Sequence, residues 1–301
     1  MILSILIVSW NTRDLLRRCL ASIAAQQGDF PWGEVETIVV DNASTDGSVE
    51  VLRSEFPATR LLANLHNVGY ARANNQGIQA GQGTFLLLLN PDTELYPGAL
   101  HHLVHFLEQE PRAGAAGACL LNPDGTLQAS AFPMPGLARE LWRLLWLDAV
   151  QPRSAYPLRA WASLSPRPVD VVQGASLMLR RAALDEVGLL DEDYFMYTEE
   201  VDVCYRLARA GWKVYWVPQA RVLHHGGQST RQVATEMFLR LYESKVIFFR
   251  KHYGGGTTFL YKVVLVAASL PRIVLGILRP SAGGRAVSSN YLRLVKSLPG
   301  F

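Results

Sequence analysis

Polar residues suited to nucleotide and metal binding stand directly after three apolar runs in the first third of the chain. These clusters are Ser9-Trp10-Asn11 after Ile2–Val8, Asp41–Gly47 after Val35–Val40, and Asn90-Pro91-Asp92 after Phe85–Leu89. A carboxylate such as Asp41 can accept hydrogen bonds from a base or a ribose. Asp92, with Glu94, could hold a divalent cation that stabilises a departing diphosphate. Each cluster alone also fits an ordinary cap or turn, so their joint occurrence is what favours a binding site.

Short apolar runs bounded by turn residues are typical of strands that are buried on both faces of a sheet. Helix-like segments lie between these runs; after Asn11 and Thr12, for example, Leu16, Leu20 and Ile23 share one helical face. Alternating strands and helices predict an α/β fold with a mostly parallel sheet flanked by helices. Because ligands bind at the carboxyl ends of parallel strands, we expect the three polar clusters to converge on one crevice.

The second half of the chain predicts further strands and helices around an irregular excursion. Strand character returns at Ala115–Leu121, Val169–Arg180, Lys213–Val217 and Arg221–His224, and helices are expected at Glu199–Ala210 and Thr235–His252. Prolines, arginines and tryptophans break the pattern between Phe132 and Pro168, where a helix is expected near residues 137–148. We therefore predict one large α/β domain over residues 1–250 and a basic, apolar, helical C-terminal tail over residues 251–301.

Composition and missing motifs exclude several classes of protein. The sequence has no GxGxxG after its first apolar run and no GxxxxGK(S/T), which weighs against dinucleotide-binding and P-loop folds. A net charge of +3 gives no reason to expect a nucleic-acid partner. Cys19, Cys119 and Cys204 lie in apolar or helical contexts and are expected to be buried and unpaired, as in a reducing compartment. The amino end does not read as a signal peptide, so a cytoplasmic location is expected.

Seven segments, in order, resemble the motifs of family 2 glycosyltransferases with the GT-A fold. They are LSILIVSWNT, VVDNASTDGS, NVGYARANNQG, LLLLNPDTEL, VVQGASLMLRR, YFMYTEEVDVCYRLARAGW and ARVLHHGGQST, spread over residues 2–250. The resemblance is closest to the bacterial rhamnosyltransferase-like branch, which acts on cell-wall and O-antigen glycans. It implies that residues 1–250 form a Rossmann-like GT-A catalytic domain.

The resemblance assigns donor-binding roles to the polar clusters. Asp41 would contact the pyrimidine base, and Ser9 and Asn11 would lie beside the nucleotide. The loop and helix that approach the nucleotide would contribute Asn67, Gly69 and Asn74.

The family's DxD metal motif corresponds here to Asn90-Pro91-Asp92, so one anionic ligand is replaced by Asn90. Both Asn90 and Asp92 are expected on the donor side, and Asp92 is an expected ligand of Mg²⁺ or Mn²⁺. His224 matches a histidine that faces the diphosphate or the metal ion, and imidazole can fill either role. An isolated pair such as His224-His225 is otherwise more often structural.

The segment Thr198–Asp202 matches the family's acidic catalytic motif, in which the second acid, here Glu200, is the base. An inverting transfer needs a carboxylate that takes the proton of the acceptor hydroxyl. Glu199 and Asp202 are the other catalytic candidates, although acids in a first helical turn also simply complement the helix dipole. On the acceptor side the resemblance places Gly174 and Ala175, together with Glu200. Such small residues would leave room for a sugar ring, but close packing requires them equally.

The tail has the composition of a membrane-surface segment. Phe259–Leu278 is long and apolar enough to span a bilayer, but Lys262, Pro271 and Arg272 interrupt it. No acidic residue follows Glu243, so the tail is strongly basic. These features favour peripheral contact with the inner face of the cell membrane over a spanning helix. A buried pair of helices is the alternative.

These features together predict an inverting glycosyltransferase that uses a nucleotide-diphosphate sugar and a lipid-linked cell-wall or O-antigen glycan. The resemblance implies L-rhamnose, carried by dTDP, as the sugar. Two alternatives stay open. A nucleotidyltransferase would need a glycine-rich, basic triphosphate loop where SWNTRDLL stands. A non-catalytic scaffold subunit with the same fold would have no need of Asp92 or of the acids from Glu199 to Asp202.

Overall fold

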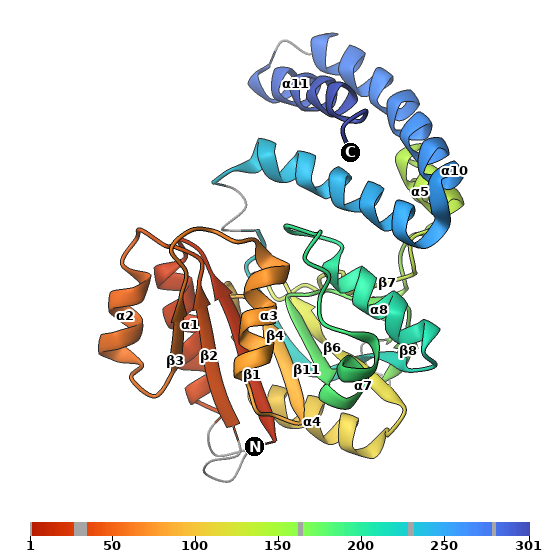
Figure 1. Ribbon diagram of the computed structural model, residues 1–301. Helices are drawn as coiled ribbons and strands as arrows, with labels where there is room; N and C mark the ends of the chain where they lie inside the picture. Colours follow the sequence, from red (N-terminus) through yellow and green to blue (C-terminus); the bar gives the residue numbers. More distant parts are fainter. Residues whose placement is uncertain (1, 27–34, 162–164, 228–231, 279–280) are drawn as a thin grey trace. The chain divides into compact units, whose positions relative to one another are not determined.

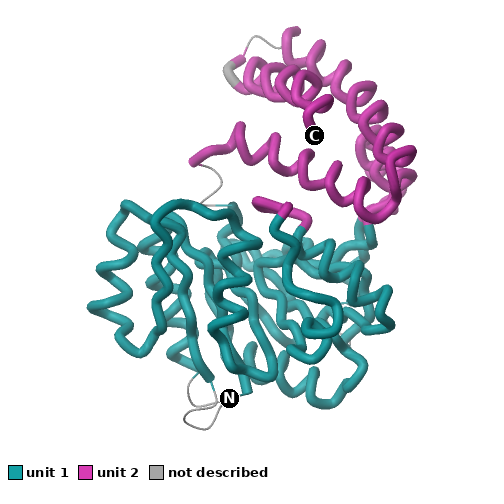
Figure 2. Tube along the Cα trace, in the orientation of Figure 1, with its two compact units in different colours: residues 1–134, 155–192, 199–231 teal, residues 135–154, 193–198, 232–301 magenta. Residues whose placement is uncertain are grey.

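The computed structural model describes residues 2–26, 35–161, 165–227, 232–278 and 281–301, so residues 228–230 of the last motif lie outside it. The chain divides into two compact units, each built from discontinuous segments (Figure 2). Unit 1 comprises residues 1–134, 155–192 and 199–231, and unit 2 comprises residues 135–154, 193–198 and 232–301. The division of the sequence at residue 250 stays a prediction.

Unit 1 is built on a nine-stranded sheet with the order β3-β2-β1-β4-β10-β6-β11-β5, in which β8 also pairs with β11 (Figure 1). A separate short pair joins β7 and β9. The strands are β1 Leu3–Ser9, β2 Val35–Asp41, β3 Arg60–Ala63, β4 Phe85–Leu89, β5 Thr93–Leu95, β6 Ala113–Leu121, β7 Ala131–Phe132, β8 Arg167–Val169, β9 Val171–Val172, β10 Ser176–Arg180 and β11 Lys213–His224. The helices of unit 1 are α1 Arg13–Ala24, α2 Ser48–Glu55, α3 Tyr70–Ala80, α4 Ala99–Gln109, α6 Leu158–Trp161, α7 Arg181–Val187 and α8 Glu199–Arg209.

Alternation along the buried strands divides the core of unit 1 into two layers. In β1, Leu3, Ile5 and Ile7 point to one face of the sheet, where they pack with residues of α1, α2 and α4. Leu6 points to the other face, which is covered by residues of α3, α7 and α8. Because successive side chains of a strand point to opposite faces, an unbroken apolar run can serve both layers. The three cysteines are buried in these layers, as their contexts predicted: Cys19, Cys119 and Cys204.

The predicted α/β fold with flanking helices is confirmed, but the sheet is mixed rather than mostly parallel. Strands β3, β2, β1 and β4 are parallel to their neighbours in that order. Beyond them, β10 runs antiparallel to both β4 and β6, and β5 and β8 run antiparallel to β11. Apolar character identifies a buried strand but carries no information about its direction. The prediction of a mostly parallel sheet was therefore wrong for β8 and β10 in the second half of the chain.

A single strand, β11, replaces the two strands predicted at Lys213–Val217 and Arg221–His224. Its register against β6 shifts between Val217 and Arg221. Pro218 lies in that interval and cannot donate to a neighbouring strand, so the shift accommodates it while the strand continues. The strand thereby carries His224 to the edge of the sheet, opposite Thr93 of β5.

Unit 2 is helical and consists of α5 Leu137–Leu144, the 3₁₀ turn η2 Leu147–Ala149, α10 Ala234–Leu278 and α11 Ala282–Ser297. Helix α10 is broken at Gly254, whose φ of 81° is a conformation that glycine adopts without strain. The predicted helix at Thr235–His252 is its first part, and the apolar run Phe259–Leu278 is its second. An apolar core joins α10 to α11 and includes Tyr242, Phe249, Tyr261, Leu265 and Leu294.

In the second part of α10, charged side chains form hydrogen bonds within unit 2, whereas several apolar side chains are exposed. Lys262 Nζ donates to the backbone oxygen of Phe301 at 2.7 Å, and Arg272 donates to the backbone oxygen of Leu144 at 2.6 Å. Phe259 and Leu278 are 67% and 69% exposed. Within the part of the chain that the structure describes, α10 alone is long and apolar enough to cross a membrane. Of its most apolar stretch of 18 residues, 28% is buried.

A buried ionic cluster ties α5 to α10 within unit 2. Glu140 is 6% exposed, and its two carboxylate oxygens accept hydrogen bonds from Lys245 Nζ, both at 2.9 Å. Arg143 donates to the same carboxylate at 2.7 Å. Burial opposes the ionisation of Glu140, but Lys245 and Arg143 outweigh it and lower the pKa of Glu140 to about 2.

Replacing Glu140 with glutamine is therefore expected to lower the free energy of unfolding at pH 7 by roughly 3 kcal/mol, since it leaves two cations without their counter-charge. A lowered carboxylate pKa gives stability that is present above the ordinary pKa and is lost as the pH falls. The difference between the two proteins should accordingly shrink between about pH 4.5 and pH 2. Urea unfolding at several pH values measures it. Glu243→Gln, which removes the more exposed pair with Arg240, should cost less than about 1 kcal/mol; equal losses would contradict the assignment.

Candidate active site

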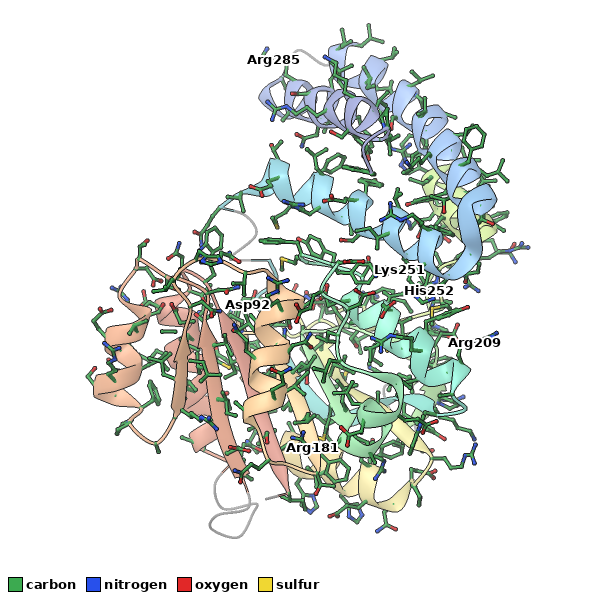
Figure 3. The ribbon with its side chains drawn as sticks, viewed as in Figure 1. Asp92, Arg181, Arg209, Lys251, His252 and Arg285 are labelled. Atoms are coloured by element: carbon green, nitrogen blue, oxygen red, sulfur yellow. The ribbon has the colours of Figure 1, made fainter. Side chains whose placement is uncertain are left out.

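The polar clusters lie together at one edge of the unit 1 sheet. Ser9 and Asp41 are register partners at the ends of β1 and β2. Asp92 follows β4 at the same edge (Figure 3), and the backbone N–H of His225, just after β11, donates to the backbone oxygen of Asp92 at 2.9 Å. Strands that are distant in the sequence thus bring base-binding and metal-binding candidates to one place.

The loop after β2 is fastened to the loop after β1. The backbone N–H of Asn11 donates to Ser44 Oγ at 2.9 Å, and the backbone N–H of Thr45 donates to Asn11 Oδ1 at 2.8 Å. Asn11 and Ala43 have φ values of 51° and 65°, which cost a non-glycine residue about 1–2 kcal/mol each. Strained backbone of this kind is concentrated at ligand sites.

Asp41 is almost fully buried and has one satisfied and one unsatisfied oxygen. Oδ2 accepts from the backbone N–H of Ser44 at 2.9 Å, whereas Oδ1 has no hydrogen-bond partner among the described residues. Since buried acceptors are nearly always satisfied, Oδ1 is suited to accept a hydrogen bond from a bound base. Ser9 has a different task, because its hydroxyl shares a hydrogen bond of 3.1 Å with Thr12 at the start of α1.

Asn67 and Gly69 shape the loop that leads into α3. Asn67 Oδ1 accepts from Asn42 Nδ2 and from the backbone N–H of Gly69, both at 3.0 Å. Gly69 has a φ of 89° and a ψ of 166°, a conformation open essentially to glycine alone. Asn74 donates to the backbone oxygen of Tyr70 at 2.9 Å, and its buried Oδ1 lacks a partner in the described part of the chain. Asn74 therefore offers an acceptor, while Asn67 and Gly69 hold the loop.

Tyr70 connects the expected donor and acceptor sides. Its hydroxyl donates to Asn90 Oδ1 at 2.9 Å and lies 3.3 Å from the backbone oxygen of Gly174. Burial raises the pKa of Tyr70, and the carboxyls of Glu199 and Glu200 raise it further, so the phenol stays a hydrogen-bond donor. Asn90, which stands at the first position of the family's DxD motif, is thus occupied as an acceptor for a phenol.

Asp92 and His224 face each other inside the protein. His224 Nε2 lies 3.4 Å from Asp92 Oδ1, with both side chains less than a tenth exposed. Gln128 fixes the imidazole: its Nε2 donates to Asn122 Oδ1 at 2.9 Å, which turns Gln128 Oε1 towards His224 Nδ1 at 2.6 Å. Because an amide oxygen accepts, Nδ1 is the donor in this contact, and Nε2 is the ring atom that faces the Asp92 carboxylate.

An imidazole nitrogen and a carboxylate oxygen that face each other in a buried place can share a cation. His224 Nε2 has no hydrogen-bond partner within the described residues. A divalent cation would satisfy this arrangement, since the carboxylate of Asp92 suits a hard cation such as Mn²⁺ or Mg²⁺ and the imidazole of His224 could be a second ligand. The described residues contain no group of three or more protein ligands, so the remaining positions would fall to substrate phosphates and water. Glu94 is engaged elsewhere, 2.8 Å from His225 Nε2.

Glu199 and Glu200 are the first two residues of α8 and place two carboxyl groups side by side in the sequence. Glu199 is 5% exposed, and its pKa is raised well above the ordinary value, first by burial and then by the charge of Glu200. When environments push two neighbouring acids apart in this way, one holds the proton and the other holds the charge. The raised pKa of Glu199 favours its protonated form, and Glu200 stays the predicted base.

Asp202 and the Gly174 turn surround this pair. Asp202 is 1% exposed and accepts a hydrogen bond from Arg206 Nε at 2.7 Å. Arg206 also donates to the backbone oxygen of Val187. That contact gives Asp202 a role in holding the segment before α8. A Cβ atom added to Gly174 would lie 3.7 Å from Glu200 Cβ, so Gly174 borders the candidate base. The neighbouring Ala175 accepts from the backbone N–H of Asn90 at 3.0 Å, next to the donor side.

The sequence interpretation missed two residues of this site, Tyr70 and Gln128. Tyr70 lies in the motif NVGYARANNQG, but its partners Asn90 and Gly174 are remote in the sequence, so the motif did not indicate its contacts. Gln128 follows the turn at Asn122-Pro-Asp-Gly and carries no local signal of its own.

Sequence comparison places this site in a known family. The sequence model of Glycosyl transferase family 2 matches residues 4–151, and that of Glycosyl transferase family group 2 matches residues 85–279. The N-acetylglucosaminyl-diphospho-decaprenol L-rhamnosyltransferase of Mycobacterium tuberculosis is 33% identical to the chain over 274 residues, covering 84% of this chain and 86% of that protein. The chain therefore belongs to glycosyltransferase family 2, and the predicted resemblance and enzyme class are confirmed.

Solved structures agree on the fold. A mannosyltransferase from Pyrobaculum calidifontis, solved in complex with GDP-Man and Mn²⁺, has a TM-score of 0.60 at 16% identity and covers 99% of this chain and 84% of its own. GalNAc-T7, solved with UDP, GalNAc and Mn²⁺, has a TM-score of 0.57 at 18% identity and covers 74% of this chain and 44% of its own. These similarities support the GT-A fold of unit 1.

Proposed function

We propose that this glycosyltransferase moves a sugar, with inversion, from a nucleotide-diphosphate donor to a hydroxyl of a lipid-linked glycan. The observation that carries the proposal is the gathering of three unlike groups at one sheet edge. They are the unsatisfied Asp41 Oδ1, the facing pair of Asp92 and His224, and the adjacent acids Glu199 and Glu200, of which Glu199 has a raised pKa. Base recognition, diphosphate binding and proton removal are the three tasks that sugar transfer needs.

On the donor side, Asp41 accepts a hydrogen bond from the base, and Asn74 on α3 offers a second buried acceptor. Asp92 and His224 would hold Mg²⁺ or Mn²⁺ at the diphosphate, and the bound ion would supply positive charge that stabilises the leaving group. Gln128 keeps His224 in the tautomer that this role needs. Tyr70 holds Asn90 and the turn at Gly174 at a fixed spacing from each other.

On the acceptor side, Glu200 takes the proton of the acceptor hydroxyl as its oxygen attacks the anomeric carbon of the sugar. The nucleoside diphosphate leaves from the opposite face, which inverts the configuration. The similarity to the mycobacterial enzyme supports L-rhamnose as the sugar and a diphosphate-linked polyprenyl glycan as the acceptor. The exposed apolar surface of α10 supports peripheral contact with the inner face of the cell membrane.

A donor panel tests this function. Purified protein is mixed with dTDP-L-rhamnose, UDP-glucose, UDP-N-acetylglucosamine or GDP-mannose, a polyprenyl diphosphate glycan, and Mg²⁺ or Mn²⁺, and released nucleoside diphosphate is followed. We expect release from dTDP-L-rhamnose above the other donors, and loss of release with a chelator. If no donor reacts and no nucleotide binds at saturation, the protein is instead a scaffold with a glycosyltransferase fold.

Replacing Gln128 with leucine is expected to lower the affinity for Mn²⁺ by about 10–100-fold, because the Nδ1–H of His224 loses the acceptor that fixes its tautomer. Calorimetry with Mn²⁺ in the presence of nucleoside diphosphate measures this change. Gln128→Glu keeps an acceptor oxygen and should keep most of the affinity. Unchanged affinity in the leucine variant would remove His224 from the metal site.

A further inference from the structure

A cavity of about 570 Å³ opens at the amino end of α5, within unit 2. Helix α5 is labelled in Figure 1. The residues that line the cavity are Gly136, Leu137, Ala138, Arg139, Trp142 and Arg153. Two of these side chains are cationic and none is acidic, so the cavity favours an anion.

Arg153 is held in place before any ligand arrives. Its guanidinium lies over the ring of Trp142, 4.4 Å from the centroid, and its Nε donates to Gln151 Oε1 at 3.1 Å. Its backbone N–H donates to Asp148 Oδ1 at 3.0 Å. Trp142 is fixed in turn, since its Nε1 donates to the backbone oxygen of Gln151 at 2.8 Å. A cation ordered in advance loses little conformational entropy when an anion binds.

The backbone at this end of α5 also favours an anion. Gly136 is the N-cap, and no side chain caps the helix there. The first-turn N–H groups of a helix and its dipole bind anions, phosphate above all. A Cβ atom at Gly136 would have nothing within 4 Å, and its φ of −142° suits any residue, so the absence of a larger side chain leaves the opening clear.

Exposed apolar residues follow the cavity along the same segment. Leu145, Trp146 and Val150 are 48%, 53% and 86% exposed. Tryptophan and leucine beside cationic side chains form the pattern of a segment that lies in the interface of a membrane, with its charges at the level of the lipid phosphates. The binding of a soluble anion would not require these exposed apolar side chains beside the cavity.

We propose that this cavity binds the phosphate or diphosphate group of a lipid, with the apolar residues from α5 to η2 inserted beside it. Arg139 and Arg153 provide the charge, the first turn of α5 provides N–H donors, and Trp142 forms the wall. The inference rests on the proposed function, for which it supplies a site that captures a phosphate-bearing lipid at the membrane surface. Two sources share this chemistry, the polyprenyl phosphate of an acceptor and the headgroup of a bulk anionic phospholipid.

Gly136→Asp tests the site because it should affect folding and binding in opposite directions. An aspartate at the N-cap stabilises a helix, so the melting temperature should stay the same or rise. The same carboxylate stands at the mouth of the cavity, so the affinity of the full chain for lipid-phosphate vesicles should fall by at least about tenfold. Gly136→Ala adds a side chain without charge and should keep the affinity of the natural chain.

Three kinds of vesicle distinguish the sources: phosphatidylcholine alone, with phosphatidylglycerol, or with polyprenyl phosphate. Binding that requires polyprenyl phosphate assigns the cavity to the acceptor lipid, and binding to both anionic types assigns it to lipid phosphate in general. Equal binding to all three, or unchanged binding by Gly136→Asp, overturns the proposal.

A charge control completes the test. Arg153→Gln should lower vesicle affinity by about fivefold, whereas Arg285→Gln on α11 removes the same charge from the same unit and should have little effect. Equal losses would mean that diffuse charge, and not the cavity, attracts the membrane. Nucleotide binding is measured separately on each variant, so a failure of the proposed sugar transfer is recognised independently of a failure at this cavity.

Discussion

Replacing Glu200 with glutamine is expected to lower kcat by about 10²–10⁴-fold, while the protein folds and still binds its donor. Glutamine keeps the size of the side chain but cannot take the proton of the acceptor hydroxyl. Glu200 is the better candidate because the neighbouring Glu199 is buried and has a raised pKa, which disfavours a negative charge on Glu199. Initial rates of sugar transfer, with donor affinity measured by calorimetry, test this expectation.

Glu199→Gln is the matched control for this prediction. A glutamine amide resembles the protonated carboxyl that Glu199 is expected to hold, so the variant should lose less than about tenfold in kcat. It should also lose less stability than the natural chain as the pH rises above the ordinary range of a glutamate, since ionisation of a buried acid with a raised pKa destabilises the fold. If the two variants lost equal activity, the pair would act as one unit, and if Glu200→Gln kept full activity, the base would lie elsewhere.

The half of the site that depends on strand ends could be predicted from the sequence. β1, β2 and β4 are unbroken apolar runs, and parallel strands with polar residues at their carboxyl ends must present those residues at one edge. Ser9 and Asp41 accordingly became register partners. Nothing beyond local composition was needed, because each decisive residue follows directly on the strand that positions it.

The other half depends on contacts that no local pattern encodes. Strand β10 enters antiparallel between β4 and β6, and its direction places the turn at Gly174 beside Tyr70 and Glu200. Gln128 reaches His224 across 96 positions of sequence. Unit 2 likewise gathers α5 and α10 around Glu140 and Lys245, two charges whose burial composition alone does not reveal. Such contacts are decided by tertiary packing, which periodicity and turn chemistry do not specify.

Asp92→Asn is the second substitution with a large expected effect: kcat/KM and the affinity for Mn²⁺ should each fall by at least about 100-fold. The substitution preserves the size of the side chain, removes its negative charge and replaces one carboxylate oxygen by an amide nitrogen. Glu94→Gln removes the neighbouring carboxylate, which already pairs with His225, and should change activity less than about fivefold. Full activity of Asp92→Asn in a chelator would show that catalysis does not use a metal ion at this position.

The same substitution also separates a cation site from an ordinary ion pair. In the natural chain, His224 Nε2 faces a carboxylate oxygen of Asp92 at 3.4 Å, and a cation held by both would bring a positive charge between them. The amide introduced by Asp92→Asn can donate directly to Nε2, so the arrangement becomes neutral and complete without a cation. Mn²⁺ with nucleoside diphosphate should therefore raise the melting temperature of the natural chain but not that of the variant. Equal stabilisation of both would mean that the ion binds elsewhere.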